Sequence, residues 1–149
     1  MEGEYKNYKD KEEKIFYAFQ RKQAYLRYFW MYVRYLPISP ISILRFTGAK
    51  IGKDVFIGGR STDPDLVEIG DNTTIGIDAI ISCHIRDNER LVIKRVKIGK
   101  SCLIGGRSSV MPGVLIGNNV IVAAGALVPK DAYLPDNSTW AGVPARRIE

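Results

Sequence analysis

Residues 96–128 read VKIGKSCLIGGRSSVMPGVLIGNNVIVAAGALV, and an aliphatic residue recurs there at every sixth position. A second run with the same period precedes this one, and eleven of the twelve periodic positions are Ile or Val. The twelve are Ile51, Ile57, Asp63, Ile69, Ile75, Ile81, Ile98, Ile104, Val110, Ile116, Val122 and Val128. Glycine often follows the aliphatic residue. A two-sided strand explains alternation but not a glycine every sixth residue, so the pattern indicates a hexapeptide repeat.

Three sides of six residues close a triangular coil, and coils of this kind stack about 4.8 Å apart. We therefore expect Ile51 to lie beneath Ile69, and Ile98 beneath Ile116. The pattern predicts an all-β repeat fold, a parallel β-helix of about four to five coils. Asp63 and the proline after it depart from the pattern and indicate a distorted corner.

The repeat is interrupted once. Ile81 and Ile98 are 17 residues apart, one short of a whole coil, and the polar segment between them contains the only histidine, His84. We expect this segment to leave the prism. A histidine in a surface loop often has no task, but its position at the single interruption favours a chemical role for His84.

The N-terminal region differs in composition from the repeats. Of the 15 aromatic residues, 11 lie between Tyr5 and Tyr35. Apolar residues recur at helical spacing from Lys9 to Tyr35, and Pro37 and Pro40 follow, so we predict one or two helices and then a turn. The predicted division is a helical extension over residues 1–48 and a β-helix domain with a C-terminal tail over residues 49–149.

Composition limits the classes of function. The chain has 149 residues, a net charge of +6 and two cysteines, which fits one globular domain in a reducing compartment; we expect a cytoplasmic protein. The uncharged run over residues 108–129 is broken by proline and glycine and is not expected to span a membrane. One histidine cannot form a three-histidine zinc site, and no metal is predicted.

Residues 97–131, followed by Ala141-Gly-Val-Pro-Ala-Arg146, resemble the C-terminal half of the hexapeptide-repeat acyltransferases. The shared elements are Ile-Gly-Gly-Arg, Pro-Gly-Val-x-Ile-Gly-x-Asn, Lys-Asp and Ala-Gly-x-Pro-Ala-Arg, and the maltose, galactoside and xenobiotic acetyltransferases are the most similar. The resemblance covers about residues 45–149. It implies a left-handed β-helix assembled as a homotrimer. Residues 1–44 lie outside the resemblance, and we expect them to form an N-terminal α-helical cap because solenoids require a terminal cap.

The resemblance also implies an activity. His84 matches the family's general base, which takes a proton from an alcohol or amine as that group attacks a thioester. Acetyl-CoA or another acyl-CoA is the implied donor, and a sugar or amino sugar the implied acceptor. Asp87 is the nearest acidic residue that could orient the imidazole.

The positions that match the family's coenzyme contacts are Gly106, Ala124, Pro129, Lys130 and Arg146. Small side chains at the first two would let the pantetheine arm reach exposed backbone, and the two cations would pair with phosphates. For each cation the alternative is a solvated surface charge.

Cys83 adjoins the histidine, but neighbours along a strand point to opposite faces, so thiol catalysis is not expected. Cys102 falls in the small inward column and is expected in the core.

Other functions stay open. A catalytically silent β-helix could serve as a scaffold or assembly subunit. A net charge of +6 is modest for a nucleic-acid partner, and we predict none. The N-terminal helix covers the first coil near Ile51 and Ile57, packs between subunits, or lies on an anionic membrane surface through residues 9–36. The side chains proposed for the cover are Phe16, Phe19, Leu26, Phe29, Trp30 and Val33.

Overall fold

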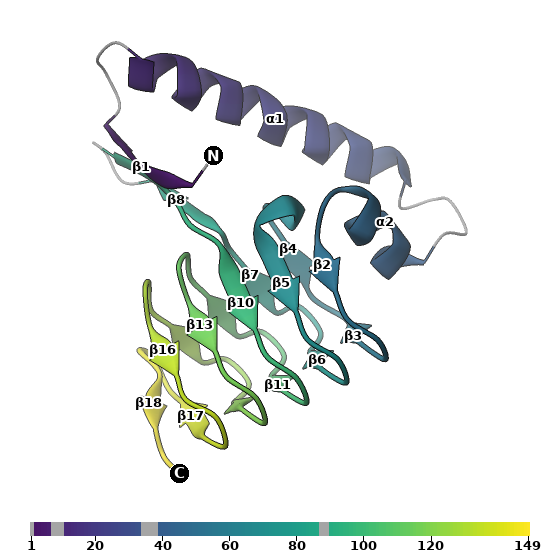
Figure 1. The fold of residues 1–149 in the computed structure, drawn as a ribbon, viewed down its shortest axis with the longest axis vertical. Coiled ribbons are helices and arrows are strands. Elements are labelled where there is room, and N and C mark those ends of the chain that lie inside the picture. Colours follow the sequence, from purple (N-terminus) through teal and green to yellow (C-terminus); the bar gives the residue numbers. More distant parts are fainter. Residues whose placement is uncertain (1, 7–10, 34–38, 87–89) are drawn as a thin grey trace.

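The computed structural model describes residues 2–6, 11–33, 39–86 and 90–149, and most of them form a left-handed parallel β-helix (Figure 1). Its first sheet contains β2 (Lys50–Ile51), β5 (Val67–Ile69), β10 (Val96–Ile98), β13 (Leu115–Ile116) and β16 (Tyr133–Leu134). The second contains β3 (Phe56–Ile57), β6 (Thr74–Ile75), β11 (Leu103–Ile104), β14 (Ile121–Val122), β17 (Thr139–Ala141) and the antiparallel β18 (Arg146–Arg147). The third contains β4 (Arg60–Ser61), β7 (Ile80–Ile81), β12 (Ser109–Val110) and β15 (Leu127–Val128). The predicted fold class is confirmed.

The coils stack in the predicted register. Ile51 pairs with Ile69, and Ile98 pairs with Ile116. Ile69 also pairs with Ile98, so the stack is continuous across the interruption. The inward side chains form one buried apolar column, which is the core of the molecule.

The chain turns at three edges of the prism. The first edge joins the first and second sheets, the second edge joins the second and third sheets, and the third edge leads from the third sheet to the next coil. At most of these corners one residue has a positive φ, and it is usually Asp or Asn, which tolerate this conformation. The non-glycine residues in this conformation are Asp54, Asn72, Asp78, Ser101, Arg107, Asn119, Asp131 and Asn137.

The interruption after Ile81 forms a separate small sheet. β8 (His84–Arg86) pairs antiparallel with β9 (Arg90–Ile93), and β1 (Gly3–Lys6) pairs with the other side of β9. The chain therefore leaves the prism at the third edge, as expected from the sequence.

The corner at Asp63 is distorted, as predicted, but the six-residue count through it is wrong. Ile81 pairs with Ser61 and not with Asp63. The third side of the first coil is therefore short, and the chain continues through Asp63 into the 3₁₀ helix η1 (Pro64–Leu66). This shift leaves the Asp63 side chain fully buried at the third edge.

Two helices precede the coils. Pro40 begins α2 (Pro40–Phe46), because the first turn of a helix tolerates a residue without an N–H donor. α2 lies beside β2 at the N-terminal end of the stack (Figure 1), and its Leu44 lines the interior of the first coil with Ile51 and Ile57. The cover of the first coil therefore comes from α2.

The longer helix, α1 (Lys11–Val33), lies along the side of the stack above the third edge (Figure 1). Phe19, one of the side chains proposed for the cover, instead packs beside His84. The side chains of Phe16, Trp30 and Val33 lie outside the described residues. No helix in the described parts of the chain is long and apolar enough to cross a membrane. The domain division at residue 48 stays a prediction.

Candidate active site

His84 begins β8, at the point where the chain leaves the prism. Strand alternation sends Cys83 inward, where it is fully buried, and leaves 26% of the His84 side chain exposed. The Ser82 hydroxyl donates a hydrogen bond of 2.6 Å to the backbone carbonyl of His84. The imidazole is therefore held on a short strand and open on one side.

The Asp63 carboxylate holds one nitrogen of this imidazole. Its Oδ2 lies 2.6 Å from His84 Nδ1 and also accepts a 2.7 Å hydrogen bond from the Thr62 hydroxyl. Gln23 Nε2 donates to Oδ1. A carboxylate at Nδ1 favours the tautomer with the proton on Nδ1, which leaves Nε2 as the basic nitrogen.

Sequence reasoning missed Asp63. Asp87, the acidic partner suggested for His84, lies outside the described residues. The available signal is the break in the hexapeptide pattern at Asp63, which by itself indicates only a distorted corner.

Helix α1 forms one wall of the site. The Phe19 ring meets the His84 ring edge-on, with 4.9 Å between the ring centroids, and only 3% of Phe19 is exposed. Lys22 Nζ lies 2.5 Å from Asp65 Oδ2 in η1. These contacts fasten the helix to the corner that carries Asp63.

A cavity of about 520 Å³ separates α1 from the β8–β9 hairpin. It is lined by Phe19, Gln20, Gln23, Ala24, His84, Arg86 and Leu91. Its volume is typical of small-molecule sites. His84 is thus an oriented, partly exposed imidazole in a cavity, which is the arrangement that a general base requires.

The two cysteines are unsuited to nucleophilic chemistry. Burial, with a smaller effect from the Asp63 charge, raises the pKa of the Cys83 thiol to about 12. Burial also raises the pKa of Cys102, which lies in the core as predicted. Because the thiolate is the reactive form, both thiols are inert near neutral pH.

Three of the predicted coenzyme positions share the second edge. Gly106 and Ala124 occupy the same place in adjacent coils, and the Gly106 carbonyl accepts a 2.9 Å hydrogen bond from Gly125 N. Arg146 pairs with Ala141 at the C-terminal end of this edge and is exposed.

Pro129 and Lys130 lie instead on the third edge, after β15 and two coils from His84. Lys130 Nζ is 3.9 Å from Glu4 Oε1, and the same oxygen lies 3.2 Å from Lys94 Nζ. One chain therefore does not bring Lys130 together with the second-edge positions.

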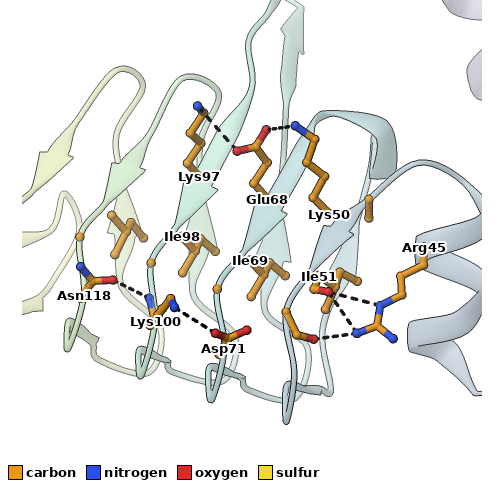
Figure 2. Close-up of a pocket in the computed structure, with 16 residues that line it drawn as sticks. Arg45, Lys50, Ile51, Glu68, Ile69, Asp71, Lys97, Ile98, Lys100 and Asn118 are labelled. Carbon is orange, nitrogen blue, oxygen red and sulfur yellow. Dashed lines mark hydrogen bonds and ion pairs between the residues drawn. The ribbon is translucent and has the colours of Figure 1, made fainter.

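A larger groove, about 730 Å³, crosses the outer side of the first sheet (Figure 2). Its charged groups pair with one another: Glu68 with Lys50 at 3.0 Å, and Asp71 with Lys100 at 3.1 Å. The hydrogen bond from Lys50 lowers the pKa of Glu68, and the backbone N–H of Lys53 lowers that of Asp71. The groove contains none of the predicted site residues, so the cavity at His84 is the better candidate. Among the described residues, no three His, Cys, Asp or Glu side chains gather into a metal site.

Two family models match the chain. The bacterial transferase hexapeptide (six repeats) matches residues 95–130, and the hexapeptide repeat of succinyl-transferase matches residues 48–62 and 66–90. Together the two models span most of the β-helix, and the chain belongs to the hexapeptide-repeat transferases. No curated protein sequence matches the chain.

Solved structures of three acetyltransferases are similar to the chain. A hexapeptide-repeat acetyltransferase from Vibrio cholerae O1 biovar eltor, complexed with acetyl-CoA, is 25% identical with a TM-score of 0.63 over 68% of this chain and 60% of its own. A galactoside acetyltransferase in complex with coenzyme A is 22% identical, with a TM-score of 0.68 over 87% and 80%. A maltose O-acetyltransferase from Clostridium difficile 630 is 24% identical, with a TM-score of 0.60 over 73% of each chain. The chain thus spans 60% of the length of the Vibrio cholerae protein, and the other two likenesses show the shared fold.

Proposed function

We propose that this chain is an acyl-CoA-dependent acyltransferase with His84 as its general base. The observation that carries the proposal is the 2.6 Å contact between His84 Nδ1 and Asp63 beside a cavity of about 520 Å³. Family membership supports acyl-CoA as the donor, since the similar Vibrio cholerae structure holds acetyl-CoA.

In the proposed reaction, His84 Nε2 accepts the proton of the acceptor's hydroxyl or amino group as that group attacks the thioester carbonyl. The new C–O or C–N bond forms first, and the C–S bond then breaks. The imidazolium returns its proton to the leaving sulfur, so the coenzyme departs as the thiol and no covalent enzyme intermediate forms. Asp63 holds the Nδ1 proton and stabilises the transient imidazolium, as the carboxylate does in other acid–histidine pairs.

A sugar or amino sugar is the proposed acceptor. The cavity beside His84 is lined by the amide of Gln20 and the guanidinium of Arg86, groups that can hydrogen-bond to hydroxyls, and by the apolar Leu91. Two similar structures carry the names of maltose and galactoside acetyltransferases, which supports this class of acceptor.

We propose that the active site is shared between subunits of a homotrimer. Within one chain, His84 lies on the third edge, whereas Gly106 and Ala124 lie on the second. Coenzyme along the second edge of one subunit would therefore reach the His84 of a neighbour. An exposed apolar row on the outer side of the second sheet supports self-association, and its members are Phe56, Leu103 and Ile121.

The test of the base is substitution of His84. His84→Ala should lower kcat about a hundredfold to ten-thousandfold and leave the KM for acetyl-CoA nearly unchanged. The assay is thiol release from acetyl-CoA with a panel of sugars and amino sugars. Asp63→Asn should lower kcat at least about tenfold, and Asp54→Asn, an exposed corner residue on the first edge, should match the parent. Parent-like turnover in His84→Ala would remove His84 from the mechanism, and a parent inactive on the whole panel would favour the scaffold alternative.

The proposed coenzyme site is tested by binding. Lys130→Ala and Arg146→Ala should each weaken coenzyme A affinity by a few-fold to about tenfold, because each removes a phosphate-pairing cation. Both side chains are outside the core, so the folded state should persist. Calorimetric titration of coenzyme A measures the affinity, and unchanged values for both variants would contradict the placement.

A further inference from the structure

One polar contact of helix α1 reaches the His84–Asp63 pair from outside the β-helix. Gln23 Nε2 donates a hydrogen bond to Asp63 Oδ1. The two residues are 40 positions apart, and Gln23 lies on α1 whereas Asp63 lies at the third edge. The chain therefore brings a neutral donor to the far oxygen of the carboxylate that holds the imidazole.

The burial of Asp63 makes this donor consequential. None of Asp63 is exposed, so both carboxylate oxygens depend on protein donors. Oδ2 has the Thr62 hydroxyl and His84 Nδ1, whereas Gln23 is the one donor that the described residues offer to Oδ1. Without it, the buried carboxylate gains by rotating toward other donors, and that rotation weakens its hold on Nδ1.

We propose that Gln23 is a positioning residue, which fixes the Asp63 carboxylate so that His84 keeps its proton on Nδ1 and its base at Nε2. The inference rests on the proposed function and extends it, because it makes α1 a working part of the active site. The edge-on contact of Phe19 with the His84 ring brings the same helix against the base itself.

The test compares two neighbouring side chains of α1. Gln23→Met keeps the length and apolar stem of the side chain but removes the donor, and we expect kcat for acetyl transfer to fall at least about tenfold with an unchanged KM for acetyl-CoA. Lys22→Met is the matched control. It removes the ion pair with Asp65, a second tether of α1, without touching Asp63, and should stay within about twofold of the parent.

Nitrogen NMR measures how fast the Nδ1 proton of His84 exchanges with solvent, a rate that should not change when only a structural contact is lost. His84 is the only histidine, so its two ring nitrogens are assigned without ambiguity. In the parent and in Lys22→Met we expect a slowly exchanging Nδ1 proton, and in Gln23→Met faster exchange of that proton.

The outcomes separate this inference from the proposed function. Turnover of Gln23→Met within twofold of the parent would overturn it, as would an equal loss in Lys22→Met, which would mean that helix docking alone matters. If Gln23→Met does not fold, side-chain amide exchange in the parent decides: Gln23 should exchange at least about tenfold more slowly than the exposed Gln20, and equal rates would reject the contact. A parent without transfer activity would count against the proposed function, while the two NMR measurements would still decide the role of Gln23.

Discussion

Glycine and the Asp or Asn residues of the repeat meet different needs at the edges of the prism. The left-handed corner conformation is usually taken by Asp or Asn, as at Asn119, whose φ is 54°. The glycine that follows the inward aliphatic residue instead permits close approach between coils. A Cβ on Gly99 would lie 2.4 Å from the carbonyl oxygen of Gly117 in the next coil. The period-six glycine is therefore a requirement of stacking.

This distinction predicts that substitutions at two glycines differ in their effect on the stability of the fold. Gly99→Ala should destabilise the fold by about 1–3 kcal/mol, because backbone must move to admit the methyl group. Gly125→Asn should stay close to the parent, since Gly125 has a φ of 71°, which Asn tolerates, and a Cβ there meets nothing within 4 Å. Thermal unfolding measures both. A larger loss at position 125 than at position 99 would contradict the assignment.

The role of His84 could be predicted from the sequence, but the contact of Asp63 with it could not. The interruption of a strict period marks His84 without knowledge of any contact. Asp63 lies 21 residues earlier, and the two meet only because a short third side shifts the chain by two residues at one corner. The six-residue period assigns Asp63 to the inward aliphatic column, whereas Ser61 is the residue that pairs with Ile81. The contact of Asp63 with His84 therefore becomes visible only when the strand register is known. The positions inferred for the coenzyme likewise divide between two edges, which linear order does not reveal.

For the helices too, the sequence predicts that the element exists but not what it packs against. Helical spacing over residues 9–35 predicts a helix, and α1 (Lys11–Val33) confirms it. Periodicity does not state what a helix packs against, because that depends on contacts distant in sequence. A short helix beginning at Pro40 covers the first coil, and the long aromatic helix lies beside the base.

Two deletions separate the roles of these helices. Removal of residues 1–38 keeps α2, so the β-helix should still fold and unfold cooperatively, but kcat should fall about a hundredfold or more because the wall with Phe19 and Gln23 is gone. Removal of residues 1–47 also uncovers the first coil at Ile51 and Ile57 and should give aggregated protein.

Size-exclusion chromatography and the thiol-release assay measure both deletions. Full activity after removal of residues 1–38 would contradict the role of α1 in the site. If that active protein also no longer sediments with anionic liposomes, the interfacial-helix alternative is supported instead.

At the scale of the whole molecule, the outer sides of the sheets differ in character. The outer row of the second sheet contains Phe56, which is 58% exposed, and Leu103, which is 44% exposed. In the first sheet the same positions hold the charged Lys50, Glu68 and Lys97 in the first three coils. Only its last two coils carry exposed apolar side chains there, Leu115 and Tyr133. The proposed trimer therefore has an apolar side available on each subunit.

We expect Phe56→Glu and Leu103→Glu to shift the trimer to monomers, because each would bury an unpaired charge at the subunit contact. Phe46→Glu is the matched control, since Phe46 is 83% exposed on α2 and should leave the trimer intact. Sedimentation equilibrium gives the mass. A trimer in both sheet variants would place the subunit contact on another side.

The β8–β9 hairpin, which carries His84, does not stack in register with the coils of the prism. Val67–Ile69 pairs directly with Val96–Ile98, so the coils on either side meet as though the intervening residues were absent. One residue inserted within a coil would displace every inward side chain that follows, whereas doubling the length of this excursion costs only about 0.6 kcal/mol in loop entropy. The segment next to the base is consequently the one that evolution can lengthen, shorten or replace at little expense to folding. A change of sequence or length in this segment can therefore alter what the site recognises without altering the prism.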